Sequence, residues 1–279
     1  MTQMLLSLTK GVYFPNDVVE GRAVLSAPKA VQLRGVTLLV EGTERTSVTV
    51  SSGKHSHTYV SRNDILRHSV ALAGQCDLPP GEHSYPFRFH LPPGALPGYR
   101  GRHASIIYSV TANADIPNWF DAHCTLEVPV GVPRQAVNRD DRRVMFQSTT
   151  AQDPLRPGFN ASLKRCFFLA GETIEGALTL TTAAGKRIRK AELFLRTLET
   201  AVAQGHQAAF PTLHNSAQIP GDQLVEGAAV PFSLSIPREC FSSYQGAFSS
   251  LKWLVEINLD IALGFDVSAT AEIAVVNAV

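Results

Sequence analysis

The sequence predicts an all-β protein made of two tandem antiparallel β-sandwiches joined by a linker. Three observations support this fold class: apolar and polar residues alternate in short segments, Gly- and Pro-rich turns separate those segments, and several segments recur in the second half of the chain in the same order. No window shows a sustained helical period, so short strands joined by turns explain the pattern best.

Alternation marks the strands of the first half, because successive side chains of a strand point to opposite faces of its sheet. It is clearest in the segments GVTLLVEG, PFRFHLP and SIIYSVTANADI. The residues that share the inward faces are Val36, Leu38, Val40, Phe87, Phe89, Leu91, Ile106, Tyr108 and Val110. Turn residues such as Pro79-Pro80-Gly81 and Pro92-Pro93-Gly94 separate these segments.

The second half of the chain repeats the first. At a shift of 155 residues, DVVEGRAVL (17–25) matches ETIEGALTL (172–180), and RGVTLLVEGTE (34–44) matches RKAELFLRTLE (189–199). At a shift of 145, PFRFHLP matches PFSLSIP, and the face of Ile106, Tyr108 and Val110 matches Leu251, Trp253 and Val255. A one-residue slip would invert the faces, so their agreement predicts a tandem duplication.

The repeat sets the predicted domain organisation. We expect an N-terminal sandwich over residues 1–132, a polar linker or hinge over 133–158 and a C-terminal sandwich over 159–279. Within the linker, the segment RVMFQS is left open as a strand. The change in shift places about ten extra residues of the first copy within segment 45–70. We expect the part of that segment from Ser51 to Asn63 to form a mobile contact loop.

Composition and charge exclude several functional classes. The chain has 279 residues, 44% hydrophobic content and a formal net charge of +1, so it lacks the basic field that attracts nucleic acid. It shows no basic leader and no apolar run long enough to span a bilayer. These features predict a cytoplasmic protein without an integral membrane segment. Peripheral membrane association stays open. The cysteines Cys76, Cys124, Cys166 and Cys240 lack paired spacing and are interpreted as separate thiols.

The order of these segments resembles the arrestin-like family. The resemblance rests on VYFPNDVVEGRAVL, VQLRGVTLLVEGTERT and LPPGEHSYPFRFHLPPGALPGYRGRHASIIYSVTANADIP, followed by a weaker second copy. It implies two immunoglobulin-like, arrestin-type sandwiches in a non-enzymatic adaptor or scaffold that binds protein partners in trafficking, signalling or stress- and sporulation-type regulation. The sequence has no PPxY motif and stops at TAEIAVVNAV, so it is more similar to minimal or bacterial-type members than to receptor arrestins.

Candidate functional residues point to partner binding rather than catalysis. No catalytic, cofactor-binding or metal-binding residue is assigned, because nucleophile and phosphate-binding motifs are missing and the His55-x-His57 pair lacks a third ligand. The residues expected to contact a protein partner are Lys54, His55, His57, Arg62, Trp119 and Phe120. Two alternatives stay open, a metal-dependent enzyme that uses the histidines of the first copy and a self-assembling structural protein.

Overall fold

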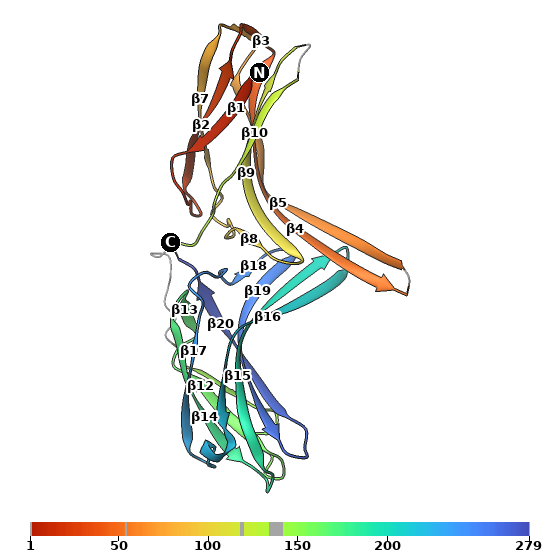
Figure 1. Ribbon diagram of the computed structural model, residues 1–279, viewed down its shortest axis with the longest axis vertical. Coiled ribbons are helices and arrows are strands. Elements are labelled where there is room, and N and C mark those ends of the chain that lie inside the picture. Colours follow the sequence, from red (N-terminus) through yellow and green to blue (C-terminus); the bar gives the residue numbers. More distant parts are fainter. Residues whose placement is uncertain (1, 54, 118–119, 134–141, 279) are drawn as a thin grey trace.

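The computed structural model describes residues 2–53, 55–117, 120–133 and 142–278. These residues form two β-sandwiches stacked end to end along the long axis, with the N-terminal sandwich at the top of Figure 1. Nearly all of the regular structure is β-strand, and the one helical element named below is a short 3-10 turn. The all-β fold class predicted from the sequence is confirmed.

The N-terminal sandwich consists of two main sheets. The first sheet has the order β1-β2-β7, and the second has the order β10-β9-β4-β5, with β8 paired to β9. A small sheet of β3 and β6 lies beside them. The strands are β1 (Gln3–Leu8), β2 (Val18–Ala27), β3 (Val31–Leu33), β4 (Gly35–Ser52), β5 (His55–Ala73), β6 (Cys76–Leu78), β7 (Gly81–His90), β8 (Tyr99–Arg100), β9 (Ala104–Asp115) and β10 (Ala122–Glu127).

The C-terminal sandwich repeats this plan. One sheet has the order β11-β12-β14-β17, and the other has the order β13-β20-β19-β15-β16, with β18 paired to β19. The 3-10 turn η2 (Gly221–Gln223) connects β16 to β17. The strands are β11 (Val144–Gln147), β12 (Gly158–Leu163), β13 (Phe167–Leu169), β14 (Thr173–Thr182), β15 (Ile188–Ala203), β16 (His206–Pro220), β17 (Ala229–Ser235), β18 (Tyr244–Gln245), β19 (Ser249–Ile261) and β20 (Val267–Val276).

Equivalent turns of the two sandwiches use equivalent carboxylates. In the N-terminal turn, Asp121 accepts hydrogen bonds from the Ile116 backbone N–H and the Asn113 side chain, both at 3.3 Å. In the C-terminal turn, Asp266 accepts the same two bonds from residues 261 and 258, at 3.3 and 3.4 Å. These aspartates therefore stabilise turns, as expected of a residue type that favours them.

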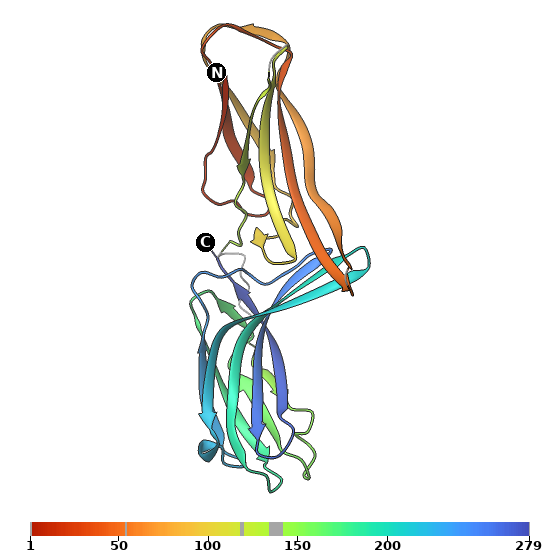
Figure 2. The ribbon, with the colours of Figure 1, turned by 45° about the vertical axis from the view of Figure 1, so that its right-hand side comes forward.

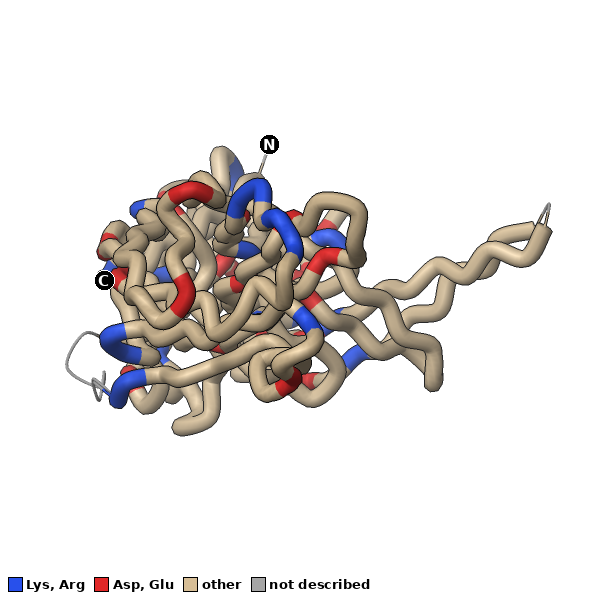
Figure 3. Tube along the Cα trace, turned by 90° about the horizontal axis from the view of Figure 1, so that it is seen from below, with Lys and Arg blue, Asp and Glu red and all other residues tan. Residues whose placement is uncertain are grey.

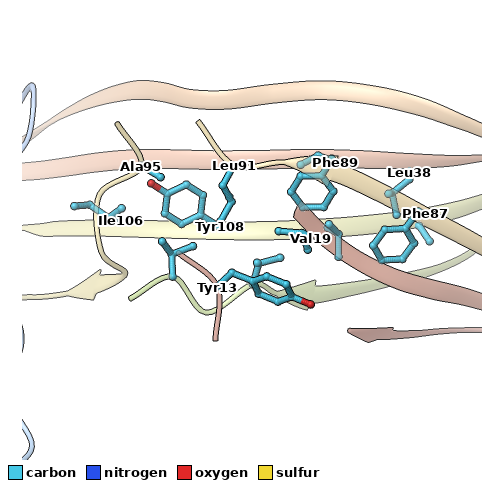
Figure 4. Close-up of a cluster of buried hydrophobic side chains, with 14 of the residues drawn as sticks. Tyr13, Val19, Leu38, Phe87, Phe89, Leu91, Ala95, Ile106 and Tyr108 are labelled. Carbon is cyan, nitrogen blue, oxygen red and sulfur yellow. The ribbon is translucent and has the colours of Figure 1, made fainter. Parts of the chain in front are cut away.

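The buried cores follow the predicted inward faces. The first core, part of which Figure 4 shows, contains all nine residues expected on the inward faces of the first copy, each at most 7% exposed. In the second core, Leu193, Trp253 and Val255 are fully buried. Their sheet neighbour Leu251 is 4% exposed. The predicted faces are therefore confirmed. The first core also includes Leu251 together with Ala201, Ala203 and Tyr244, so apolar packing continues across the junction between the sandwiches.

Part of the segment predicted as a linker belongs to a sheet. Strand β11 lies within residues 133–158 and pairs with β12 from Val144↔Leu163 to Gln147↔Asn160. The alternative that RVMFQS pairs as a strand is therefore confirmed, and β11 lies at a sheet edge where it buries little of its surface. The boundaries at residues 132 and 159 stay a prediction.

Two long hairpins meet at the junction of the sandwiches. The β4–β5 hairpin of the N-terminal half and the β15–β16 hairpin of the C-terminal half cross there, and the β4–β5 hairpin continues outward beyond the contact (Figures 1 and 2). The β15–β16 hairpin ends in a two-residue turn in which Gln204 and Gly205 both have positive φ, 50° and 82°. Such a turn matches the twist of the flanking strands and fixes their register.

Candidate functional site: the projecting arm and the domain junction

The outer end of the β4–β5 hairpin, residues 47–61, projects from the body of the molecule and is called the arm below (Figure 3). Its strands pair in continuous register from Ser47↔Val60 to Ser52↔His55. Strand β4 also pairs with β9, but that ladder ends at Thr46↔Ala104. Beyond this point the arm is a two-stranded ribbon. The backbone N–H and C=O groups along the outer edge of each strand point away from the other strand, so the β4–β5 ladder does not use them.

The arm carries very little charge. Its sequence, SVTVSSGKHSHTYVS, contains no Asp, Glu or Arg and one Lys, whereas 18% of the whole chain is charged. Figure 3 shows the described part of the arm in tan, beyond the last charged residues of the hairpin. Natural sheet edges are usually protected by charged residues, prolines or bulges. An uncharged ribbon with open edges is therefore suited to pairing with another strand.

Charged residues gather instead at the root of the arm. The Arg62 guanidinium contacts Asp64 at 2.6 Å and Glu41 at 3.1 Å. The hydrogen bond from Arg62 lowers the pKa of the Asp64 carboxyl. Arg67 joins the same group, at 3.6 Å from both carboxylates. The predicted contact residue Arg62 thus takes part in an ion-pair network on the β4–β5 surface.

The other predicted contact residues lie in different places. His55 is exposed beside the tip of the arm and faces Ser52 in the strand register. The His57 ring packs edge-on against Tyr59 at 4.5 Å. Phe120 is 83% exposed in the turn before β10, well away from the arm in sequence and sheet order. Lys54 and Trp119 lie outside the described residues. The structure therefore groups His55 and His57 on the arm and leaves Phe120 apart.

The flank of the arm contacts the C-terminal half. The Tyr59 ring stacks on His206 at a centroid distance of 3.8 Å. The Gln204 backbone N–H donates to Ser61 Oγ, and its side-chain amide donates to the Val60 carbonyl, both at 3.1 Å. These contacts place the turn of the β15–β16 hairpin against the base of the arm and leave Val50 and residues 51–53 and 55–58 exposed.

A carboxylate of the C-terminal half is buried in a turn of the N-terminal half. Glu199, on β15, is only 4% exposed. Its side chain accepts hydrogen bonds from the Tyr99 hydroxyl at 2.8 Å, the Arg102 backbone N–H at 2.9 Å and the His103 backbone N–H at 2.5 Å. Burial, and secondly the bond to Glu199, raise the pKa of Tyr99, so its hydroxyl stays protonated and donates.

The inverse arrangement lies beside it. Glu44, on β4, is fully buried and accepts hydrogen bonds from the backbone N–H groups of Ala247 and Phe248, at 3.0 and 2.9 Å. Ser249 Oγ also donates to it at 2.7 Å, and the Asn63 amide donates at 3.4 Å. Glu44 and Glu199 are equivalent at the shift of 155, and their backbone donors are equivalent at the shift of 145. The junction therefore has approximate twofold symmetry.

Sequence reasoning missed this pair, although one signal was available. Glu44 lies on the inward face that Val36, Leu38 and Val40 form in the first copy, because it follows them in steps of two. Glu199 lies in the same way on the inward face of Ala191, Leu193 and Leu195 in the second copy. A carboxylate at the same position of the inward face in both copies is unusual, because buried charges require hydrogen-bond partners. That coincidence points to a shared structural requirement.

Two clefts adjoin the junction. One has a volume of about 560 Å³ and lies between the Pro129–Gly131 segment and residues 239–242. The other, about 300 Å³, has Glu199, Phe210 and Trp253 in its lining, and both clefts include His214 and Phe241. The His214 ring stacks on Trp253 at 4.5 Å, and burial lowers the pKa of this imidazole.

In the part of the chain that the structure describes, no three His, Cys, Asp or Glu side chains are grouped as metal ligands would be. Within the same residues, no helix has the length and apolar character needed to cross a membrane.

Comparison with known proteins agrees with the fold. Residues 3–135 match the family model of the arrestin (or S-antigen) N-terminal domain. The N-terminal half of the chain is arrestin-like. The chain is 30% identical over 125 residues to arrestin domain-containing protein 1 of Rattus norvegicus and 32% identical over 126 residues to the Homo sapiens protein of that name. It is also 30% identical over 135 residues to arrestin domain-containing protein 4 of Mus musculus.

These alignments cover part of each protein. They include 43–44% of this chain, 28% of the rat and human proteins and 32% of the mouse protein. The chain thus spans less than a third of the length of these curated relatives.

Proposed function

We propose that this chain is a non-enzymatic adaptor that binds protein partners through its arm. The supporting observation is the outer part of the arm, residues 49–53 and 55–58, which is exposed and presents open strand edges. The arm also contains a single charged residue, one Lys. An extended peptide adds to such an edge through backbone hydrogen bonds, while alternate side chains determine which peptide fits. The arrestin-like N-terminal half supports a role in trafficking or signalling.

The contact surface in this proposal is the exposed outer part of the arm, residues 49–53 and 55–58. Val50 is 39% exposed on β4, and the cross-strand pair Thr49–Thr58 is joined by a 2.9 Å hydrogen bond between hydroxyls. His55 and His57 add rings on β5 that both donate and accept hydrogen bonds. These groups favour a polar, β-forming segment of a partner over a charged one.

Replacement of Lys54, His55 and His57 with alanine tests the proposal. The triple variant is expected to lose partner capture from a lysate of the native host. It should keep the thermal unfolding midpoint of the wild-type chain, because His55 and His57 are exposed and exposed substitutions change stability little. A photo-crosslinking residue at Ser56 should label the captured partner, and the same residue at Lys186, on the exposed β14–β15 turn, should not. Full capture by the triple variant would contradict the proposal.

A further inference from the structure

Each sandwich supplies two elements to the domain junction, a carboxylate on a long strand and a turn that receives the carboxylate of the other sandwich. The receiving turns are residues 101–104, between β8 and β9, and 246–249, between β18 and β19. Two backbone N–H groups and one hydroxyl reach each carboxylate. The contact is therefore made twice, with the roles of the two sandwiches exchanged.

The donors that reach Glu44 and Glu199 among the described residues are uncharged. A buried carboxylate is expensive unless hydrogen bonds replace its hydration, and bonds to a charged acceptor are about twice as strong as neutral ones. These bonds also depend on direction. A rotation of one sandwich against the other would misalign the donors of both carboxylates together, which makes one relative orientation strongly preferred.

The receiving turns are shaped for the carboxylates. A Cβ atom at Gly101 would collide with the Glu199 carboxylate, and a Cβ atom at Gly246 would collide with the Glu44 carboxylate. Neither glycine has the positive φ that would by itself require this residue type. The absent side chains therefore leave room for the group that arrives from the other half.

The same contacts extend to the arm. Two residues beyond Glu44 on β4, the Thr46 hydroxyl donates to the Val202 carbonyl of β15 at 2.7 Å. The Ser47 backbone N–H then donates to the carbonyl of His103, which belongs to the turn that holds Glu199. The arm begins at this point, so the orientation of its first residues depends on both carboxylate contacts.

We propose that Glu44 and Glu199 form a reciprocal latch that holds the two sandwiches, and the root of the arm, in one fixed orientation. Each carboxylate closes one side of the junction. Loss of the hydrogen bonds to one carboxylate permits the two sandwiches to rotate against each other. That rotation also weakens the hydrogen bonds to the other carboxylate, so the two contacts act as a pair.

Hydrogen exchange of the full chain, followed by mass spectrometry, tests the latch. Glu44→Gln and Glu199→Gln keep the side-chain volume but turn an amide donor toward backbone N–H groups. Each variant is expected to raise exchange roughly tenfold or more in both receiving turns, 101–104 and 246–249, while strands β9 and β19 keep their protection. Glu41→Gln and Glu192→Gln, on the same strands and outside the latch, serve as matched controls and should leave both turns unchanged.

Small-angle X-ray scattering of the same variants reports the orientation of the sandwiches, and a wider distribution of sizes is expected for the latch variants alone. Unchanged exchange and scattering would overturn the proposal. Faster exchange only in the turn that contacts the altered carboxylate would overturn the paired action. A uniform rise in exchange across both sandwiches would also overturn the latch, because it would show that the carboxylates stabilise the whole fold. If a glutamine variant does not fold, Gly101→Ala and Gly246→Ala displace the carboxylates from the opposite side and must give the same paired result.

Discussion

Replacement of Tyr99 with phenylalanine should destabilise the chain more than the equivalent replacement of Tyr244. The two tyrosines correspond at the shift of 145, are 5% and 7% exposed, and pack against each other with ring centroids 4.9 Å apart. Their hydroxyl groups differ in their partners. The Tyr99 hydroxyl donates to the Glu199 carboxylate at 2.8 Å, whereas the Tyr244 hydroxyl donates to the neutral Ser249 Oγ at 3.0 Å.

This difference sets the expected magnitudes. Loss of a hydrogen bond to a charged group costs about 1.5–3 kcal/mol, and loss of a neutral bond costs about 0.5–1.5 kcal/mol. The ring and its packing are kept in both variants, so no cavity adds to the cost. With a urea slope of about 3 kcal/mol/M, a cost of about 2 kcal/mol for Tyr99→Phe lowers the unfolding midpoint by about 0.7 M, against about 0.3 M for Tyr244→Phe.

Urea unfolding at pH 7, followed by circular dichroism, measures both shifts. Ser249→Ala removes both the hydroxyl donor to Glu44 and the acceptor of the Tyr244 hydroxyl, so its shift should be at least as large as that of Tyr99→Phe. Equal shifts for the two tyrosine variants, or a larger shift for Tyr244→Phe, would refute the reasoning that the charged acceptor decides the cost.

Three further outcomes are expected. Gly21→Ala and Gly176→Ala should each lower the free energy of unfolding by about 1–3 kcal/mol, measured by urea unfolding, because a Cβ atom would collide with the Phe87 or Phe232 ring and an adjacent carbonyl oxygen. Burial lowers the pKa of His214, so below about pH 6.5 the unfolded chain binds a proton at this imidazole more readily than the folded chain does. The free energy of unfolding should therefore fall between pH 7 and pH 5, and this fall should be smaller in His214→Gln than in the wild-type chain. Burial raises the pKa of Cys240 to about 11, so this thiol should react with iodoacetamide at pH 8.5 more slowly than a free cysteine, as followed by peptide mass spectrometry; an equal rate would count against its burial.

The architecture was predictable because duplication and alternation are local patterns that repeat. Val36, Leu38 and Val40, with Leu193 and Leu195 in the second copy, lie on the inward faces that the period of two assigns to them. The segment of the first copy that holds the extra residues forms the β4–β5 hairpin. The expectation of a loop from Ser51 to Asn63 is wrong, because residues 51–52 and 55–63 of that range are paired strand, within the register from Glu44↔Asn63 to Ser52↔His55.

The junction was less accessible to sequence reasoning. Alternation gives the face of Glu44 but not its partner, because residues 247–249 lie about 200 positions away and meet Glu44 only after both sandwiches have formed. The projection of the arm also depends on where β9 stops pairing with β4, at Ala104. Strand β11 was ambiguous because a short edge strand needs few apolar residues.

The approximate twofold symmetry of the junction changes how this chain tolerates substitution. In an assembly of two identical subunits, one codon change alters both sides of the contact at once. Here the halves are covalently fused and encoded separately, so each side accumulates changes on its own. The two hairpins differ: the β4–β5 hairpin extends past the junction as the arm, whereas the β15–β16 hairpin ends in a two-residue turn that rests against it.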